Sequence, residues 1–295
     1  MKVWTVLEMI RWTTDYLAGK EIREPRLNAE LLLAGVLGLK RLDLYLQFDR
    51  PLQPAELDEY RARLKRRARH EPLQYIAGHA DFRELRLKVD RRVLIPRPET
   101  EVLVGEVLVW AHGRTGLSVL DIGTGSGAIA LSLATEGDFE RVVAVDVSEE
   151  ALEVARENLA ALGALPVELR LGSLFEAVGG ERFDVVVSNP PYVGERERET
   201  LDREVRDWEP AAALFSGDDG LDLIGMLVSR APDYLEPGGL LAMEIGAEQA
   251  ARVAAIVRST GRFAEPRVRA DLAGRDRIIL AELAREGDHS LFEQE

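Results

Sequence analysis

The feature that most constrains the fold is a regular alternation of short apolar runs with helical stretches from residue 117 onward. Six apolar runs have the length and composition of buried strands: 118–122, 142–147, 167–171, 183–188, 240–245 and 277–282. Four stretches with helical spacing lie between them, near 127–135, 149–162, 219–235 and 247–260. Alternation of this kind predicts an α/β fold with a mostly parallel sheet that is covered by helices on both faces.

The first third of the chain is organised differently. Residues 1–72 show helical spacing throughout, and the segment 61–69 carries a strongly basic helix face. Near-alternating apolar residues over 76–95 predict a β-hairpin, and the prolines of 95–98 predict a stiff connector before a helix from Glu99 to Trp110. The sequence therefore predicts four parts: a helical domain 1–73, a β-hairpin linker 74–98, an α/β domain 99–285 and a polar tail 286–295.

Composition narrows the class of protein. The chain of 295 residues has a net charge of −14, no cysteine and only four histidines. The lack of thiols excludes disulfides and thiolate metal sites, and the scattered histidines argue against a histidine-based metal site. No run approaches the roughly 18–20 apolar residues that a membrane span requires, so we expect a cytoplasmic protein without a membrane segment. The acidic charge argues against broad nucleic-acid binding, which depends on neutralising phosphates.

A glycine-rich loop follows the first apolar run of the α/β region. Asp121 precedes three alternate glycines that let the backbone turn tightly and approach a ligand. Asp146 ends the second run, where a carboxylate can accept both hydroxyls of a ribose. The glycine spacing is not the dinucleotide pattern, and Asp121 would repel a pyrophosphate but suits a cation, so a sulfonium nucleoside fits better. The alternative is a turn that only packs a helix on a strand. The candidate cofactor contacts here are Asp121, Gly123, Thr124, Gly125, Ser126, Gly127 and Asp146.

The tetrapeptide Asn189-Pro190-Pro191-Tyr192 follows the fourth apolar run, at the sheet edge where open α/β folds bind ligands. Two successive prolines hold the backbone extended and remove two N–H donors, so carbonyls in this stretch remain available as acceptors. The Asn189 side-chain oxygen and the Pro190 carbonyl could each accept one hydrogen of a planar NH₂ group and turn its lone pair toward a methyl donor. Tyr192 could pack against the planar group. The alternative is a rigid turn after a buried strand, with Tyr192 as ordinary packing.

Together these motifs resemble those of the HemK-type (PrmC) protein-glutamine methyltransferases, which modify bacterial peptide-chain release factors. The resemblance covers nearly the whole chain and includes four further segments in the family's order: Glu71–Gly78, Ile95–Glu101, Glu204–Pro210 and Gly217–Leu221. It implies a Rossmann-like class I methyltransferase domain behind a helical domain that helps to hold the release factor. The implied activity is methylation of the glutamine in the Gly-Gly-Gln loop of class 1 release factors, on the side-chain amide nitrogen, with S-adenosyl-L-methionine as cofactor.

The resemblance also assigns residues by position. Gly123 to Gly127 would line the methionine part of the cofactor, Asp146 would bind the ribose, and Asn189 would touch both cofactor and substrate. The family usually places an acid and an aromatic residue near the adenine, whereas this chain reads Ser173-Leu174-Phe175, so Leu174 and Phe175 are the substitutes. We expect a monomer that acts without direct contact to nucleic acid. The catalytic candidates are Asn189, Pro190 and Tyr192, and the candidate substrate contacts are Asn189, Pro190, Pro191, Tyr192 and Arg97.

The residues leave several alternatives open. Arg97, Glu99 and Thr100 could close the pocket from the connector, or could only cap a proline-bounded helix. The basic segment 61–69 could meet an acidic protein or an RNA phosphate, although a charge run of this kind is more often a solvated helix face. The rival activities are methylation of an exocyclic amine of adenine or guanine in nucleic acid, cofactor binding without catalysis, and dinucleotide-dependent oxidoreduction.

Overall fold

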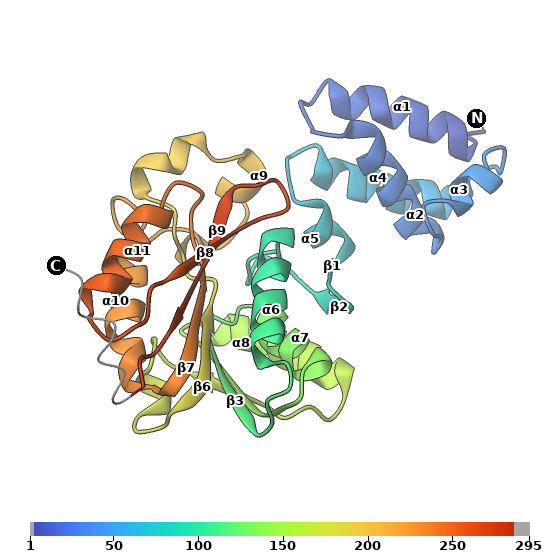
Figure 1. The fold of residues 1–295 in the computed structure, drawn as a ribbon. Helices are drawn as coiled ribbons and strands as arrows, with labels where there is room; N and C mark the ends of the chain where they lie inside the picture. Colours follow the sequence, from blue (N-terminus) through green and yellow to red (C-terminus); the bar gives the residue numbers. More distant parts are fainter. Residues whose placement is uncertain (1–2, 286–295) are drawn as a thin grey trace. The chain divides into compact units, whose positions relative to one another are not determined.

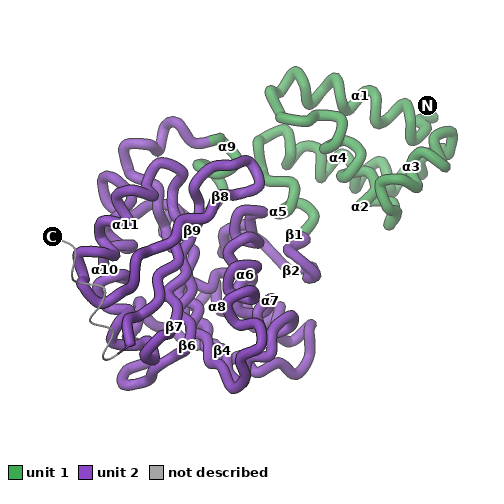
Figure 2. Tube along the Cα trace, viewed as in Figure 1, with its two compact units in different colours: residues 1–79, 202–208 green, residues 80–201, 209–295 purple. Residues whose placement is uncertain are grey.

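The computed structural model describes residues 3–285, so the predicted polar tail 286–295 lies outside the described residues. The chain divides into two compact units (Figure 2). Unit 1 contains residues 1–79 together with 202–208, and unit 2 contains residues 80–201 and 209–295. A short segment from late in the sequence therefore belongs to the unit that the N-terminal helices form.

Unit 1 consists of short helices around one apolar core, in which Tyr60 is fully buried. Its first helix begins with a capping box, in which the Thr5 hydroxyl accepts the Glu8 N–H and the Glu8 carboxylate accepts the Thr5 N–H. Two other helices begin at Pro25 and Pro54, where the missing N–H costs nothing. The helices of unit 1 are α1 (Val6–Ala18), α2 (Pro25–Leu37), α3 (Asp43–Leu46), α4 (Pro54–Arg67), α5 (Leu73–Ala77) and α9 (Arg203–Arg206).

Side chains of the N-terminal helices hold the late segment 202–208 in unit 1. Arg67 on α4 is buried and forms an ion pair with Glu204 on α9. Its guanidinium also donates to the Asn28 side chain at 2.6 Å and to the Glu71 carbonyl at 3.0 Å. Because a buried charge without partners is costly, these bonds give α9 a fixed place among helices that precede it by more than a hundred residues.

Unit 2 contains a seven-stranded sheet with the order β5-β4-β3-β6-β7-β9-β8. The first five strands in this order run parallel, and β9 runs antiparallel to β7 and to β8. The chain enters at β3, moves outward to β5 and returns to β6 beside β3, which creates a topological switch point between β3 and β6. The strands of this sheet are β3 (Leu117–Ile122), β4 (Phe139–Asp146), β5 (Val167–Leu171), β6 (Phe183–Ser188), β7 (Leu235–Glu244), β8 (Arg267–Ala270) and β9 (Asp276–Glu282).

Helices cover both faces of the sheet, as Figure 1 shows. Helices α10 and α11 pack on one face over a core that includes Leu120, while α6, α7 and α8 cover the other face over a core that includes Val119. Successive residues of β3 thus enter opposite cores, which explains why Val119 and Leu120 are both apolar at the middle of the strand. The predicted α/β class is confirmed. The helices of unit 2 are α6 (Pro98–Ala111), α7 (Ala128–Glu136), α8 (Glu149–Leu162), α10 (Asp222–Arg230) and α11 (Ala250–Ser259).

The predicted hairpin is present as β1 (His79–Phe82) and β2 (Leu85–Lys88), but other boundaries differ from the predicted ranges. Strand β7 begins at Leu235, ahead of two glycines, because its pairing with β6 shifts register there and absorbs the irregular backbone. Strand β8 was not predicted, since it is a largely exposed edge strand without an apolar run. The stretch 219–235 forms only α10 and one 3₁₀ turn. The 3₁₀ turns are Glu176–Val178, Glu195–Thr200, Ala211–Ala213 and Ala231–Asp233.

The helices are short throughout the described chain. Those of 14 residues, α4, α6 and α8, are the longest within residues 3–285, and none there has the length and apolar character to cross a membrane. The same residues contain no group of three or more His, Cys, Asp or Glu side chains suited to a metal ion.

Candidate active site

The candidate site lies at the carboxyl ends of the central strands of unit 2. Ile122 on β3 lies opposite Ser188 on β6, and Ser188 lies opposite the residue before Glu244 on β7. One position further along, the three adjacent strands β3, β6 and β7 therefore bring Gly123, Asn189 and Glu244 to the same level of the sheet. The Ser188 hydroxyl donates to the Ile122 carbonyl at 2.7 Å and ties two of these ends together. The register thus brings the glycine loop, the tetrapeptide and a buried carboxylate to the switch point.

The glycine loop after β3 leaves open space on one side. Gly123, Gly125 and Gly127 have φ angles of 77°, 57° and 85°, a region that other residues rarely adopt. A Cβ atom at Gly123 or Gly125 would meet no atom within 4 Å, whereas one at Gly127 would lie 2.9 Å from a leucine of α7. The N–H groups of Gly123 and Thr124 both donate to the Val145 carbonyl, at 2.8 and 3.0 Å. The loop is thus fixed against β4 and open above its first two glycines.

Asp146 at the end of β4 contacts the same loop. Its Oδ2 accepts the Gly125 N–H at 2.8 Å, and its Oδ1 accepts the Ser148 N–H at 2.9 Å. Burial raises the pKa of this carboxyl in spite of the backbone donors. Each oxygen has a further lone pair, so the carboxylate can still accept hydroxyl groups of a ribose. Ser126 is buried, and its carbonyl accepts the Asn158 side chain at 2.9 Å.

Asp121 lies at the end of β3 and is fully buried. The Thr124 hydroxyl donates to its Oδ2 at 2.6 Å. Burial, with a smaller contribution from the charge of Asp146, raises the pKa of Asp121 to about 7, although the hydrogen bond from the Thr124 hydroxyl and the backbone N–H of Ala130 oppose the shift. A carboxyl that titrates near neutrality can lose its proton readily when a cation comes close.

The tetrapeptide after β6 carries the polar side chains at the centre of the site. The Asn189 Nδ2 donates to the Thr100 hydroxyl at 3.0 Å, and the Tyr192 hydroxyl donates to Glu244 Oε1 at 3.1 Å. The Thr100 hydroxyl donates in turn to Glu244 Oε2 at 2.6 Å. Burial and the charge of Glu244 raise the pKa of Tyr192, so its phenol stays protonated. Pro190 is buried.

A second set of bonds fixes the backbone of the tetrapeptide. The Gln249 side chain donates to the Tyr192 carbonyl at 2.9 Å, and its Oε1 accepts the Gly246 N–H at 2.8 Å. Gly220 has a φ of 77°, and a Cβ atom there would lie 2.0 Å from the Tyr192 carbonyl oxygen. The segment 217–221 therefore passes directly beneath the tetrapeptide, at a distance that only glycine permits.

The charged residues of the connector pair with other parts of unit 2. Arg97, a predicted substrate contact, forms an ion pair with the buried carboxylate of Glu209 through Nη2. Glu99 pairs with Arg275 at 3.1 Å, and its side chain is about one quarter exposed. Thr100, by contrast, reaches the tetrapeptide. Of the three connector residues, only this one has a bond to a predicted catalytic side chain.

The two residues predicted near an adenine differ in exposure. The Phe175 ring is fully buried and stacks on Tyr234 with centroids 4.3 Å apart, so it serves the core and offers no exposed face in this structure. Leu174 has a φ of 53°, an unusual value for a branched side chain, and is 9 % exposed. The strained backbone at Leu174 therefore lies nearer the surface than the ring that follows it.

Two features of unit 2 escaped prediction. Glu244 is the only acidic residue in the apolar run 240–245, and that position at a strand end was the available signal. Gln249 lies in a helical stretch with nothing in the pattern to single it out. Its role depends on the return of the chain to Tyr192, which sequence spacing does not reveal.

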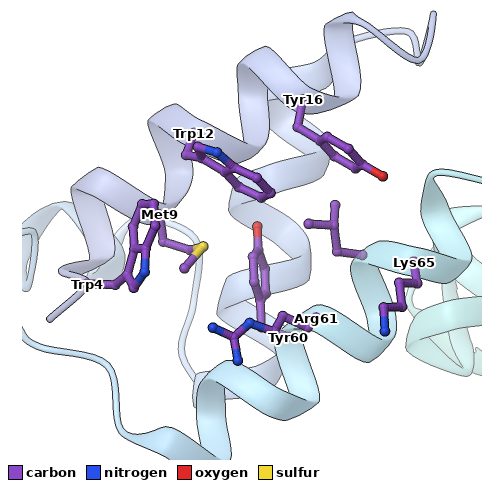
Figure 3. Close-up of a pocket in the computed structure, with 8 residues that line it drawn as sticks. Trp4, Met9, Trp12, Tyr16, Tyr60, Arg61 and Lys65 are labelled. Carbon is purple, nitrogen blue, oxygen red and sulfur yellow. The ribbon is translucent and has the colours of Figure 1, made fainter. Parts of the chain in front are cut away.

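Unit 1 has a hollow of its own, a groove of about 350 Å³ between α1 and α4. Trp12 stacks on Tyr16 with centroids 5.3 Å apart, and Trp4 meets Trp12 edge-on at 6.1 Å. Figure 3 shows Tyr60 pointing from α4 toward these α1 side chains. The groove is thus aromatic on one side and carries cationic side chains on the other. Its lining consists of Trp4, Met9, Trp12, Tyr16, Tyr60, Arg61, Leu64 and Lys65.

Known protein families match both units. Residues 8–78 match the PrmC N-terminal domain, and residues 100–205 match the methyltransferase small domain. Among solved structures, a T. thermophilus 16S rRNA methyltransferase in complex with AdoMet and guanosine is similar over 70% of this chain and 49% of its own, with 20% identity and a TM-score of 0.51. A methyltransferase from Pyrococcus furiosus is similar over 67% of this chain and 88% of its own, with 20% identity and a TM-score of 0.50. These two likenesses concern the fold alone.

Curated relatives are much closer in sequence. The release factor glutamine methyltransferase of Geobacter sulfurreducens is 45% identical over 278 residues, which cover 94% of this chain and 96% of the relative. The protein of the same name from Chlorobaculum tepidum is 45% identical over 288 residues, again 94% of this chain and 96% of the relative. The resemblance found in the sequence is confirmed, and the protein belongs to the family of release factor glutamine methyltransferases.

Proposed function

We propose that this protein methylates the side-chain amide nitrogen of the glutamine in the Gly-Gly-Gln loop of class 1 peptide-chain release factors. As a member of its family, the chain is an S-adenosyl-L-methionine-dependent methyltransferase. The observation that carries the proposal is the adjacency of Asn189 and the open glycine loop, which strand register brings to one edge of the sheet. In this proposal the enzyme is a cytoplasmic monomer and needs no nucleic acid.

The residues around the glycine loop fit the cofactor. S-adenosyl-L-methionine supplies a methyl group on a positively charged sulfur. The open space above Gly123 and Gly125 suits its methionine part, and the free lone pairs of Asp146 suit the ribose hydroxyls. Asp121 suits the methionine amino group, because a nearby cation favours ionisation of a carboxyl that titrates near 7. For the adenine we propose the backbone at Leu174, with Phe175 supporting it from the core.

The tetrapeptide fits the substrate amide. An amide nitrogen is a weak nucleophile because its lone pair is delocalised into the carbonyl. The Asn189 Oδ1 and the Pro190 carbonyl each accept one hydrogen of the glutamine NH₂, which turns the nitrogen lone pair toward the methyl carbon. Pro191 keeps this backbone extended, and Tyr192 packs against the amide plane.

No general base is required before transfer. The bound cofactor would supply the methyl group and keep the S–C electron pair on sulfur, and the substrate nitrogen, held by Asn189 and Pro190, would lose one proton to water after gaining the carbon. Tyr192 is no candidate for that proton, because the raised pKa keeps its own hydroxyl protonated. Catalysis in this proposal comes from position and electrostatics. Arg97 remains a proposed substrate contact, through guanidinium N–H groups other than the Nη2 that pairs with Glu209.

We assign the recognition of the folded release factor to unit 1. Its aromatic groove offers exposed rings, and Arg61 and Lys65 supply positive charge beside them. Trp12 is 46% exposed, a large fraction for a tryptophan, which is the residue type that most often anchors protein interfaces. A short peptide with the Gly-Gly-Gln sequence would use unit 2 alone, whereas the intact factor would use both units.

The test is methyl transfer to defined substrates. The purified enzyme and labelled cofactor are incubated with one substrate at a time. The three substrates are an intact release factor, the same factor with glutamate in place of the loop glutamine, and duplex DNA. We expect a mass gain of one methyl group on the first substrate, located to the loop glutamine by fragmentation, and none on the others. Label in the glutamate variant would contradict the assigned nitrogen. Label only in DNA would favour the exocyclic-amine alternative.

A further inference from the structure

We propose that Thr100 and Glu244 are positioning residues that fix which way the Asn189 side-chain amide faces. The inference rests on the proposed function, because it concerns the grip of Asn189 on the substrate NH₂ group. It adds Glu244, at the end of β7, to the site and gives Thr100, at the start of α6, a role in orienting Asn189. Neither is proposed to touch substrate or cofactor.

The contacts form a chain that leads inward from the tetrapeptide. The Asn189 Nδ2 lies 3.0 Å from the Thr100 Oγ1, and that oxygen lies 2.6 Å from Glu244 Oε2. The other oxygen of Glu244 accepts the Tyr192 hydroxyl at 3.1 Å. Thr100 is 4% exposed and Glu244 is 1% exposed, so water does not compete for these bonds. One carboxylate therefore anchors both polar side chains of the tetrapeptide.

This series of hydrogen bonds has one donor-to-acceptor direction, which follows from the chemistry of the groups involved. In its ionised form the Glu244 carboxylate can only accept hydrogen bonds, so the single proton of the Thr100 hydroxyl is then committed to Glu244. The hydroxyl oxygen can then only accept from Asn189, which must present its NH₂ group and not its oxygen. The Asn189 Oδ1 is thereby left for the other side, where the proposal requires an acceptor. If the amide rotated by half a turn, it would present donors to a substrate NH₂ group that is itself a donor.

The surroundings of Glu244 bear on its ionisation. Burial is the largest effect and leaves the pKa of Glu244 raised, although the hydrogen bonds from Thr100 and Tyr192 and the charge of Arg277 oppose the rise. Arg277 lies on β9, the strand paired with β7, and its guanidinium is 5.9 Å from the centre of the Tyr192 ring. Glu99 on α6 acts in the opposite sense. Arg277 is therefore the nearby cation that favours the ionised, accepting form of the carboxylate against the effect of burial.

A purely structural role would predict a different pattern of variant effects. Thr100→Val has nearly the same shape but lacks the hydroxyl, so Asn189 loses its acceptor and can rotate. Thr100→Ser restores the hydroxyl although it removes a methyl group. Glu244→Gln keeps the volume but can donate to the Thr100 oxygen, which reverses the chain and turns the Asn189 oxygen away from the substrate. Thr13→Val makes the same isosteric change at a buried helical threonine of unit 1 and serves as the matched control.

The experiment measures kcat and KM with an intact release factor, together with binding of S-adenosyl-L-homocysteine and thermal melting. We expect Thr100→Val and Glu244→Gln to lower kcat about 30-fold, since small errors in the placement of a reacting group cost up to about a hundredfold. KM and the affinity for S-adenosyl-L-homocysteine should stay within about twofold of wild type, because neither residue belongs to a binding contact. Thr100→Ser should recover kcat to within about threefold, and Thr13→Val should leave it unchanged.

Two results would overturn the inference alone. One is a Thr100→Val enzyme with kcat near that of wild type, and the other is a Thr100→Ser enzyme as slow as Thr100→Val. If Thr100→Val does not fold, the Glu244→Gln enzyme decides, and wild-type kcat in that variant counts against the inference. A wild-type enzyme that leaves the release factor unmodified would overturn the proposed function and the inference with it, so the two failures are told apart by the wild-type arm.

Discussion

The tetrapeptide site of unit 2 and the aromatic groove of unit 1 are built in opposite ways. At the tetrapeptide, Asn189, Thr100 and Glu244 are joined by directed hydrogen bonds, and the last two are almost fully buried. In the groove, Trp12 and Tyr16 present stacked rings to the surface, with Trp12 46% exposed. Reaction requires atoms held in one geometry, whereas recognition requires accessible apolar area. The two regions therefore should respond differently to the same kind of substitution.

The largest expected effect is at Asn189. Asn189→Ala removes one of the two acceptors that orient the substrate nitrogen, and we expect kcat to fall about a thousandfold, the cost of losing one well-placed hydrogen-bonding group in other enzymes. KM for an intact release factor should change little, because unit 1 is untouched. Steady-state kinetics check this, with thermal melting as the control for a folded enzyme. Unchanged turnover would show that Asn189 does not orient the substrate amide. The tetrapeptide site would then not depend on fixed geometry in the way the comparison with the groove requires.

The next effect concerns the dependence of cofactor binding on pH. Asp121 has a pKa of about 7 in the free protein, so it is mostly protonated at pH 5.5 and mostly ionised at pH 7.5. A bound cation favours the ionised form, so affinity for S-adenosyl-L-methionine should rise about 20-fold over this range, in step with the ionised fraction. Below pH 7, the Asp121 carboxyl should release its proton when S-adenosyl-L-methionine binds. Calorimetry in buffers of different ionisation enthalpy measures both quantities.

The control for this titration is Asp121→Asn, which cannot ionise. Its affinity should be lower at pH 7.5 and nearly independent of pH. Asp146 also has a raised pKa and contacts the same loop, so a pH dependence that persists in the asparagine variant would reassign the effect to Asp146. Proton release that is equal in both enzymes would contradict the role proposed for Asp121.

The same contrast explains which parts of the molecule were predictable. The glycine loop and the tetrapeptide are local in sequence, and the apolar runs before them fix their place at a sheet edge. Confirmation of the α/β class follows from the same runs, because period and length are local properties. Strand β8 was missed because an exposed edge strand needs no apolar pattern.

Partners that are distant in sequence could not be predicted. Thr100 and Glu244 are separated by 144 positions, and only the register of β6 with β7 brings Glu244 beside Asn189. Arg67 reaches Glu204 over 137 positions, so α9 could not be assigned to unit 1 from spacing. Phe175 carried an aromatic signal, yet its burial against Tyr234 depends on packing that periodicity does not encode.

The smallest expected effect concerns the aromatic groove of unit 1 and is tested at Trp12. Trp12→Ala removes an exposed ring from the groove but leaves every contact of unit 2 in place, so kcat on a short Gly-Gly-Gln peptide should not change. With an intact release factor, KM should rise about tenfold, equivalent to about 1.4 kcal/mol of binding free energy. The matched control is Phe48→Ala, since Phe48 is an aromatic residue of unit 1 that is 52% exposed and does not line the groove. Equal effects on peptide and protein substrates would mean that the substitution disturbs the structure of the enzyme and does not remove a contact to the release factor. No effect on either substrate would remove unit 1's groove from recognition and leave specificity to unit 2.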